Sequence, residues 1–520
     1  MIIIYGSEHW EIILTYMTNT TFKFSAPTFI LYMLLSATFL FMPLKNTAQT
    51  GIEFPELKIY DSSMLNIISK YKLAGGQMAI TYQGRLVYNR GFGYADTATK
   101  ELVQPESIFR LASASKSITS IALMHLYEIG KINLDAIVLG PNGIINDSQY
   151  FNAIDPRMHQ FTVRQLMNHS AGFNYDFANE PLWKTYDIAK AMGVAAPTFD
   201  FEVVLEWTIK NKSLGFKPGT SSFYSNFGYT LLGLVIKKVT NMPYETYVKD
   251  SILKPLGITD MHAGRTLKKD KFSNEVSYYD YAGAPLSPSI YTGIPNSVIS
   301  VYGGYNWEVM TPAGGWVAAA KDLCKLLTAV DGTPEQPDIL SKKTIDTMTT
   351  KSVQWPKYGL GWFVNPTDIY HTGGIQGTAT VIRIDKSNKL TFSILFNALP
   401  QDYAPLYNDF INLATDKFKD IKSWPTVDLF KTSAGNRDNN FKNNVLIYPN
   451  PVNTELNISQ IPMLKNGIIT LFNALGETKQ TYQINDTHFI LSLSDLAKGL
   501  YYITIHDDNS FKITQKITKN

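Results

Sequence analysis

The stretch Leu111-Ala112-Ser113-Ala114-Ser115-Lys116 places a serine hydroxyl and a lysine amine three residues apart, just before a long apolar run. Positions i and i+3 of a helix lie on one face, and a serine alcohol becomes a useful nucleophile only beside a group that takes its proton. The pair therefore predicts an activated serine. The spacing alone is weak support, because Ser69-Lys70-Tyr71-Lys72 repeats it where nothing else suggests chemistry.

The residues that follow Ser113 predict its surroundings. Residues 117–129 are apolar on nearly every face and end at Gly130, a pattern typical of a helix that is buried on all sides. Ser113 would lie at the N-terminus of this helix. Free backbone N–H groups and the positive end of the helix dipole favour negative charge there, such as the charge that develops on an acyl oxygen.

The flanking segments predict one sheet with a helical region beside it. Alternating apolar and polar residues indicate strands at 77–82, 85–89, 358–364, 378–384 and 390–396. Between them, helices are expected at 161–167, which opens with a threonine cap, and at 229–239. Strands from both ends of the domain can complete one antiparallel sheet, which is an α+β fold.

Length and composition exclude several classes of protein. The 520 residues are too many for one ordinary core, and the net charge of +3 without a Lys/Arg-rich run argues against a nucleic-acid partner. Cys324 is the only cysteine, which excludes an intramolecular disulfide and a cysteine-based zinc site, and we expect it to be a buried, inert thiol. The eight histidines form no HxH or HExxH spacing. We therefore expect neither a metal nor a cofactor.

The N-terminus carries the pattern of an export signal. An apolar run at 28–44 is preceded by Lys23 and followed by small and polar residues up to Ala48, so that cleavage would leave Gln49 first. We expect a signal peptide over residues 1–48, with Met17 as a candidate for the true start. A retained membrane anchor is the alternative, although Pro43 interrupts the run.

The composition changes after Trp424. Residues 425–444 are expected to be a linker, because 432–444 are rich in Asn, Ser, Asp and Lys. Residues 445–520 contain short alternating segments, at 467–472 and 499–505 among others, and predict a small all-β domain.

Two further signals follow Ser113 in the chain. The first is Tyr224-Ser225-Asn226, which comes after Pro218-Gly219, and the second is His371-Thr372-Gly373-Gly374, expected at the start of a strand. Each is weak alone. Tyr150-Phe151-Asn152 and Tyr291-Thr292-Gly293 resemble them elsewhere in the chain.

Taken together, residues 57–424 resemble the serine β-lactamase and penicillin-binding-protein superfamily, in its class C β-lactamase and DD-peptidase branch. The resemblance rests on features that occur in the right order: Ser113-x-x-Lys116, His169-Ser170-Ala171-Gly172, Tyr224-Ser225-Asn226, Ala313-Gly314-Gly315-Trp316, and Tyr358-Gly359-Leu360-Gly361-Trp362 before His371-Thr372-Gly373. It implies a domain with an antiparallel sheet and a mostly helical subdomain. It also makes the turn at His169 a packing feature rather than a catalytic one.

The resemblance implies a role for each site residue. Ser113 would form an acyl-enzyme with the help of Lys116, and the N–H groups of Ser113 and Gly374 would form the oxyanion hole. Tyr224 would carry a proton to the leaving group, which requires the Lys116 cation to lower its pKa. The remaining residues would bind substrate: Asn226 its amide side, and His371 and Thr372, with Gly373, the strand edge against which it lies.

The departures from the family pattern bear on the substrate. His371 stands where class C β-lactamases normally carry lysine, and His-Thr-Gly instead resembles the motif of some DD-carboxypeptidases and related esterases and peptidases. Neither a Ser-Asp-Asn motif nor a deacylating glutamate is evident. The favoured interpretation is a serine hydrolase that cleaves an amide or ester bond, with D-amino-acid peptides, small esters and β-lactams as substrate classes. The alternative is a catalytically idle surface protein that acts as a binding or sensor module.

Residues 445–520 resemble the C-terminal sorting domain of type IX secretion cargo, through Tyr448-Pro449-Asn450-Pro451-Val452, residues 471–476 and residues 496–502. The resemblance implies the type IX secretion machinery as a partner. With the N-terminal signal, it implies passage through the periplasm and across the outer membrane to a secreted or cell-surface location, with no stable membrane span after processing.

Overall fold

The computed structural model describes residues 2–5, 10–15, 21–25, 49–431 except 177, 197, 292–293 and 296, and 446–520 except 449–451, 460–466, 474–475, 485–487 and 507–511. The apolar run at 28–44, the expected cleavage site after Ala48 and most of the expected linker lie outside these residues. In the first unit, Met1–Gln49, strands β1 (Ile2–Tyr5), β2 (Trp10–Thr15) and β3 (Thr21–Ser25) form an antiparallel sheet.

The centre of the larger unit is a sheet built from strands of both ends of the domain. Its strand order is β13-β14-β15-β16-β5-β6-β4, with β7 also paired to β6. Strands from the two ends of the domain meet where β16 pairs antiparallel with β5, as the sequence predicted. The strands are β4 (Gln49–Gly51), β5 (Gly75–Tyr82), β6 (Arg85–Asp96), β7 (Glu101–Leu102), β13 (Phe363–Val364), β14 (Asp368–Ile375), β15 (Thr378–Asp385) and β16 (Leu390–Phe396).

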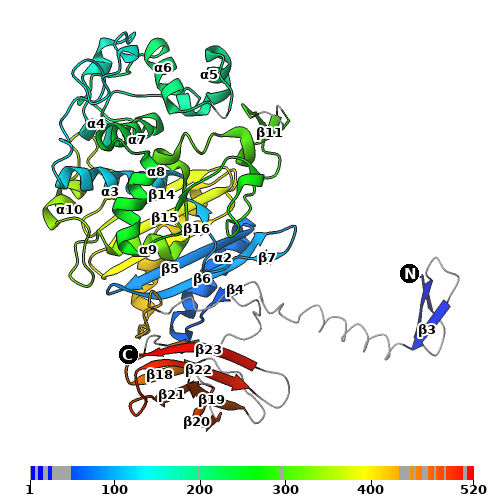
Figure 1. Ribbon diagram of the computed structural model, residues 1–520. Helices are drawn as coiled ribbons and strands as arrows, with labels where there is room; N and C mark the ends of the chain where they lie inside the picture. Colours follow the sequence, from blue (N-terminus) through cyan, green and yellow to red (C-terminus); the bar gives the residue numbers. More distant parts are fainter. Residues whose placement is uncertain are drawn as a thin grey trace. The chain divides into compact units, whose positions relative to one another are not determined.

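Both faces of this sheet are covered (Figure 1). On β5, Ala79 packs into the core on the side of α9, whereas Met78 and Ile80 pack into a second core with α2, as the alternation of a strand requires. The helices are α2 (Lys58–Tyr71), α3 (Ser115–Glu128), α4 (Val163–Met167), α5 (Thr185–Met192), α6 (Phe201–Asn211), α7 (Asn226–Thr240), α8 (Tyr244–Val248), α9 (Ala320–Thr328), α10 (Lys342–Thr349), α11 (Ala404–Phe410) and α12 (Leu413–Lys417).

Helix α3 is buried on all sides, as predicted, since every residue from Ser115 to Met124 is buried. Loops that pack around the helix accept hydrogen bonds from its hydroxyl groups. Ser117 donates to the carbonyl of Gly361 at 2.9 Å, and Thr119 donates to the carbonyl of Pro312 at 2.6 Å. These bonds fix the surrounding loops against the helix that carries the candidate lysine.

The predicted strand at 358–364 is mostly wrong, because only Phe363 and Val364 pair with β14. The glycines of this segment lie in a loop that precedes the short strand β13. Gly361 has φ +85°, and a Cβ on it would lie 2.4 Å from the side chain of Ser120, so this loop approaches α3 closely in a way that a pleated strand could not.

Hydrogen bonds continue beyond both ends of the domain expected at 57–424. Thr50 donates to the carbonyl of Val103 in the sheet region, so the fold begins before residue 57. At the other end, Asp428 accepts from the N–H of Leu86 at 3.1 Å, and Leu429 donates to the Leu86 carbonyl at 2.8 Å. Residues 425–431 therefore pack with the same domain as β6, because they satisfy backbone groups of this strand.

Three smaller sets of strands complete the fold. Strands β8 (Phe109–Arg110), β12 (Trp316–Ala318) and β9 (His262–Ala263) form one sheet, and β10 (Leu286–Pro288) pairs with β11 (Ser297–Ile299). The C-terminal part is a small two-sheet sandwich with a shared core of aliphatic side chains. Its strands are β17 (Leu446–Tyr448), β18 (Glu455–Ser459) and β21 (His488–Ser492), and β20 (Thr478–Gln483), β19 (Ile468–Asn473), β22 (Gly499–His506) and β23 (Lys512–Lys519).

The fold class is therefore the α+β arrangement followed by a small all-β domain that the sequence predicted. Cys324 is buried, and its Sγ lies 3.4 Å from the carbonyl oxygen of Ala79. Among the described residues, no helix combines the length and the apolar character needed to cross a bilayer.

Candidate active site

Ser113 lies in a short 3₁₀ turn, Ala112–Ala114, that leads directly into α3. Ala112 has φ +46°, a left-handed conformation that costs a non-glycine residue about 1–2 kcal/mol. Strain of this kind persists where the surrounding structure imposes it. In this conformation the half-buried Ser113 lines a pocket of about 400 Å³.

Lys116 lies in the first turn of α3, three residues after Ser113, and is fully buried. Its Nζ lies 3.2 Å from Ser113 Oγ, 2.7 Å from Asn226 Oδ1 and 2.7 Å from the carbonyl oxygen of Ala313. Burial lowers the pKa of Lys116 to about 7, and the charge of Glu180 offsets part of this shift. A neutral amine has two N–H groups for the two carbonyl oxygens, which leaves its lone pair facing the Ser113 hydroxyl.

Tyr224 and Asn226 come from the start of α7. Ser225 caps this helix by accepting from the N–H of Gly228 at 3.0 Å, which fixes the direction of the two flanking side chains. The Lys116 Nζ lies 4.7 Å from the centre of the Tyr224 ring.

The electrostatics of Tyr224 run against the expectation from the sequence. Burial raises the pKa of Tyr224 well above its usual value, while its hydrogen bond with Ser113 works the other way. The phenol therefore stays protonated at neutral pH instead of being tuned toward a base by Lys116. In this site the lysine is the group that loses its proton first.

His169 holds the segment around Tyr224 in place, which is consistent with a packing role for its turn. Its Nδ1 accepts from the N–H of Ser225 at 3.1 Å, and its carbonyl accepts from the N–H of Phe223 at 3.0 Å. Its ring lies 4.5 Å from that of Tyr224, centre to centre, and burial holds the pKa of His169 well below its ordinary value.

The third motif, residues 371–374, lies within β14 rather than at the start of a strand. Gly373 meets Ser113 closely: a Cβ on Gly373 would lie 3.0 Å from the Ser113 nitrogen and 2.0 Å from the Leu111 carbonyl oxygen. Gly374 lines the pocket, whereas Thr372 is half-buried and does not appear in the lining.

The side chain of His371 does not line the pocket beside Ser113. Its side chain is buried, with Nδ1 2.6 Å from the Thr372 carbonyl oxygen and Nε2 3.0 Å from the Tyr358 hydroxyl. The carbonyl must accept, so Nδ1 carries the proton and Nε2 accepts from Tyr358. Burial lowers the pKa of His371 to about 3, and the charge of Lys116 adds to this effect. The imidazole is therefore neutral.

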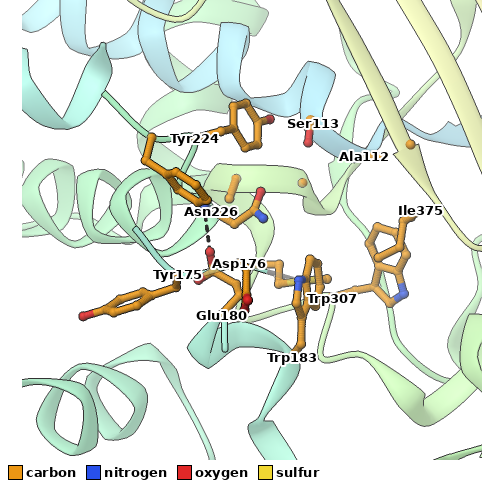
Figure 2. Close-up of a pocket in the computed structure, with 15 residues that line it drawn as sticks. Ala112, Ser113, Tyr175, Asp176, Glu180, Trp183, Tyr224, Asn226, Trp307 and Ile375 are labelled. Atoms are coloured by element: carbon orange, nitrogen blue, oxygen red, sulfur yellow. Dashed lines mark hydrogen bonds between the residues drawn. The ribbon is translucent and has the colours of Figure 1, made fainter. Parts of the chain in front are cut away.

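Several residues of the pocket were missed by sequence reasoning. Figure 2 shows Ser113 and Tyr224 on one side and Glu180, Trp183 and Trp307 across from them. Glu180 is buried, and its carboxylate accepts from the N–H groups of Asn226 at 3.3 Å and Phe227 at 3.1 Å. These residues belong to loops or short turns without periodicity, so no pattern in the chain could have marked them.

Residues 50–416 match the protein family described as Beta-lactamase. The chain belongs to this family. Residues 446–520 match the family described as a secretion system C-terminal sorting domain, which indicates secretion to the cell surface or beyond.

Similar proteins agree with the family assignment. Protein flp of Staphylococcus aureus is 24% identical over 357 residues, and the match covers 68% of this chain but only 65% of that protein. A putative D-alanyl-D-alanine carboxypeptidase of Escherichia coli O157:H7 is 26% identical over 355 residues, or 62% of this chain and 78% of that protein.

Solved structures show the same fold at low sequence identity. The octameric penicillin-binding protein homologue from Pyrococcus abyssi is 21% identical with a TM-score of 0.55, covering 89% of this chain and 100% of that chain. The D-amino acid amidase from Ochrobactrum anthropi SV3 is 21% identical with a TM-score of 0.52, covering 69% and 97%.

Proposed function

We propose that the protein is a secreted serine hydrolase that forms an acyl-enzyme on Ser113 and cleaves an amide or ester bond. The observation that carries the proposal is the environment of Lys116. Two carbonyl oxygens and one hydroxyl surround a buried amine whose pKa is lowered to about 7 by burial, which is the setting of a general base at neutral pH.

In acylation, neutral Lys116 takes the proton of Ser113 while Oγ bonds to the substrate carbonyl carbon. The N–H groups of Ser113 and Gly374 are the candidate donors to the oxyanion, as their places at the pocket suggest. Tyr224 donates its proton to the departing nitrogen or oxygen as that bond breaks. Because the pKa of Tyr224 is raised by burial and that of Lys116 is lowered, the resulting phenolate regains a proton at the expense of the Lys116 ammonium.

In deacylation, neutral Lys116 accepts a proton from water, and the water oxygen bonds to the ester carbon. The carbon–Oγ bond then breaks, and Ser113 recovers its proton from Lys116. The net reaction consumes one water and releases an acid and an amine or alcohol. It requires no group beyond these side chains.

The pocket lining indicates what kind of substrate would fit. Tyr175, Trp183, Phe223, Trp307 and Ile375 give it a largely apolar wall that suits an apolar or aromatic side group. The relatives named as a carboxypeptidase and an amidase support cleavage of an amide bond in this fold. A small amide or short peptide is therefore the favoured substrate class, followed by small esters.

The test is hydrolysis of a chromogenic cephalosporin, a D-Ala-D-Ala peptide, an amino acid nitroanilide and a short-chain nitrophenyl ester, each with wild type and Ser113→Ala. We expect turnover of at least one substrate that Ser113→Ala abolishes, together with a mass increase on the Ser113 peptide after a fluorophosphonate probe. Equal behaviour of the two proteins on every substrate, or probe labelling that survives Ser113→Ala, would overturn the proposal.

A further inference from the structure

The peptide unit that joins Gly373 to Gly374 carries the N–H group proposed above as an oxyanion donor. Its carbonyl group, on Gly373, accepts a hydrogen bond from the hydroxyl of Tyr407 in α11. The carbonyl and the N–H of one trans peptide are conjugated and point in opposite directions. Tyr407 therefore acts on the group that would bind the oxyanion from the side away from the pocket, whose lining does not include it.

Thr380, among the described side chains, also approaches the Gly373 carbonyl. Its Oγ1 lies 3.3 Å from the Gly373 carbonyl oxygen but 2.7 Å from the carbonyl oxygen of Leu111. A hydroxyl has one proton to donate, and the shorter contact to Leu111 takes it. The phenol of Tyr407 is therefore the main side-chain donor to the Gly373 carbonyl.

The local structure leaves room for this phenol and holds its ring. A Cβ on Gly374 would lie 2.5 Å from the Tyr407 hydroxyl oxygen, so only glycine at this position lets the hydroxyl reach the peptide. The Tyr407 ring packs 5.0 Å, centre to centre, from Phe410, which is buried in the core that contains α2. Burial raises the pKa of Tyr407 well above its ordinary value, so its hydroxyl keeps its proton at neutral pH.

The other candidate oxyanion donor has a similar arrangement. The N–H of Ser113 belongs to the peptide whose carbonyl is on Ala112, and this carbonyl accepts from the backbone N–H of Ser115. Hydrogen bonds in a chain polarise one another by about 10–30% per bond. At Ala112 the polarising donor is backbone, whereas at Gly373 it is a side chain that one substitution removes.

We propose that Tyr407 is a positioning residue for the oxyanion hole, whose hydroxyl orients and polarises the Gly373–Gly374 peptide so that the Gly374 N–H binds a negative oxygen more strongly. The proposal rests on the hydrolase function proposed for Ser113. Loss of a whole oxyanion donor lowers kcat by about 100- to 1000-fold, and a donor weakened by about 10–30% accounts for about 2- to 8-fold of it.

The experiment varies the donor strength of residue 407 while keeping its shape. Wild type is compared with Tyr407→Phe and with proteins that carry 3-fluorotyrosine or 3,5-difluorotyrosine at this position, because each fluorine makes the phenol a stronger donor. For a substrate that Ser113 cleaves, we expect kcat to rise in the order Phe, Tyr, fluorotyrosine, difluorotyrosine, with KM nearly constant. Tyr407→Phe should fall about 2- to 8-fold below wild type.

Tyr60→Phe is the matched control, because it removes a buried phenol that donates to the carbonyl of Ala414 at 3.1 Å. It should lower stability and leave kcat unchanged. In Tyr407→Phe, the acid limb of the pH profile should stay at about pH 7, where the pKa of Lys116 places it. The proposal is overturned by a kcat that does not follow donor strength, by an acid limb that moves, or by an equal loss of kcat in Tyr60→Phe.

Polarisation of the peptide can also be measured without a substrate. Glycine labelled with 13C at the carbonyl and with 15N gives a coupled NMR signal only from Gly–Gly pairs, which lie at 75–76, 303–304, 314–315 and 373–374. A hydrogen bond to a carbonyl deshields its carbon and the following nitrogen. We therefore expect the signal of 373–374, assigned by its loss in Gly373→Ala, to move upfield in Tyr407→Phe while the other pairs stay in place.

The two measurements separate this proposal from the hydrolase proposal. An unchanged 373–374 signal in Tyr407→Phe would refute the role of Tyr407 whatever the enzyme assays give. A shifted signal in a protein whose turnover does not depend on Ser113 would instead refute the hydrolase function, and the role of Tyr407 with it. A shifted signal together with kcat values that follow donor strength would support both.

Discussion

Replacing Asn226 with aspartate tests whether Lys116 is the base that takes the proton of Ser113. The Oδ1 of Asn226 lies 2.7 Å from the Lys116 Nζ, so the new carboxylate would sit in contact with the amine. An opposite charge within this distance raises the pKa of a lysine by about 1–3 units. Starting from the value of about 7 that burial produces, the lysine of the variant would be mostly charged at neutral pH.

The size of the effect follows from the fraction of neutral lysine. A rise of about 2 units, or about 2.7 kcal/mol, reduces the neutral fraction at pH 7 from about one half to about one in a hundred. We therefore expect kcat/KM at pH 7 to fall about 50-fold, and the acid limb of the profile to move from about pH 7 to about pH 9. The sign is fixed, because the active form is the deprotonated amine.

The assay is kcat/KM for a chromogenic anilide across the range from about pH 5 to about pH 10. Asn226→Ser is the control, since it removes the amide without adding charge, and its acid limb should not move upward. At the alkaline end, Asn226→Asp should recover toward the level of Asn226→Ser. An acid limb that stays at the wild-type position in Asn226→Asp would refute Lys116 as the titrating base.

Three further predictions address the strand, the leaving group and stability. Gly373→Ala should lower activity about 100-fold, because its Cβ would force β14 away from the serine, whereas Gly193→Ala, with φ +67° and open space, should cost only stability. Tyr224→Phe should slow an anilide by about 100-fold or more but an activated nitrophenyl ester far less, since only the poor leaving group needs the proton. Asp155→Asn should lower the free energy of unfolding at pH 7 by about 2 kcal/mol, because Arg157 lowers the pKa of Asp155 to about 2. The stability that Asp155 contributes is complete above about pH 4 and is lost as the pH falls toward 2, so urea unfolding of the two proteins should converge in acid.

The sequence predicted those parts of the molecule whose pattern is local. The alternation at 378–384 and 390–396 corresponds to β15 and β16, and the segment 117–129, apolar on nearly every face, corresponds to α3. The motifs likewise marked Ser113, Tyr224 and Asn226, three residues that the structure brings close to the amine of Lys116.

The features that the sequence did not predict depend on contacts that leave no periodic pattern in the chain. Residues 358–364 have the composition of a strand, yet Gly361 and its neighbours form a loop against α3. His371 was assigned a binding edge because of its motif, whereas the hydroxyl of Tyr358 and the Thr372 carbonyl hold it inside the protein. Glu180 carries no signal at all, since an acidic residue in a loop is ordinarily solvated.

Burial moves the titratable groups around Ser113 toward their neutral forms. Desolvation favours neutral forms of Lys116, Tyr224 and His371, which leaves little positive charge around Ser113. Burial also raises the pKa of Glu180 to about 7, and the N–H donors at the start of α7 oppose only part of this shift. The neutral histidine at position 371, held inside the protein by the Tyr358 hydroxyl and the Thr372 carbonyl, adds no positive charge to these surroundings.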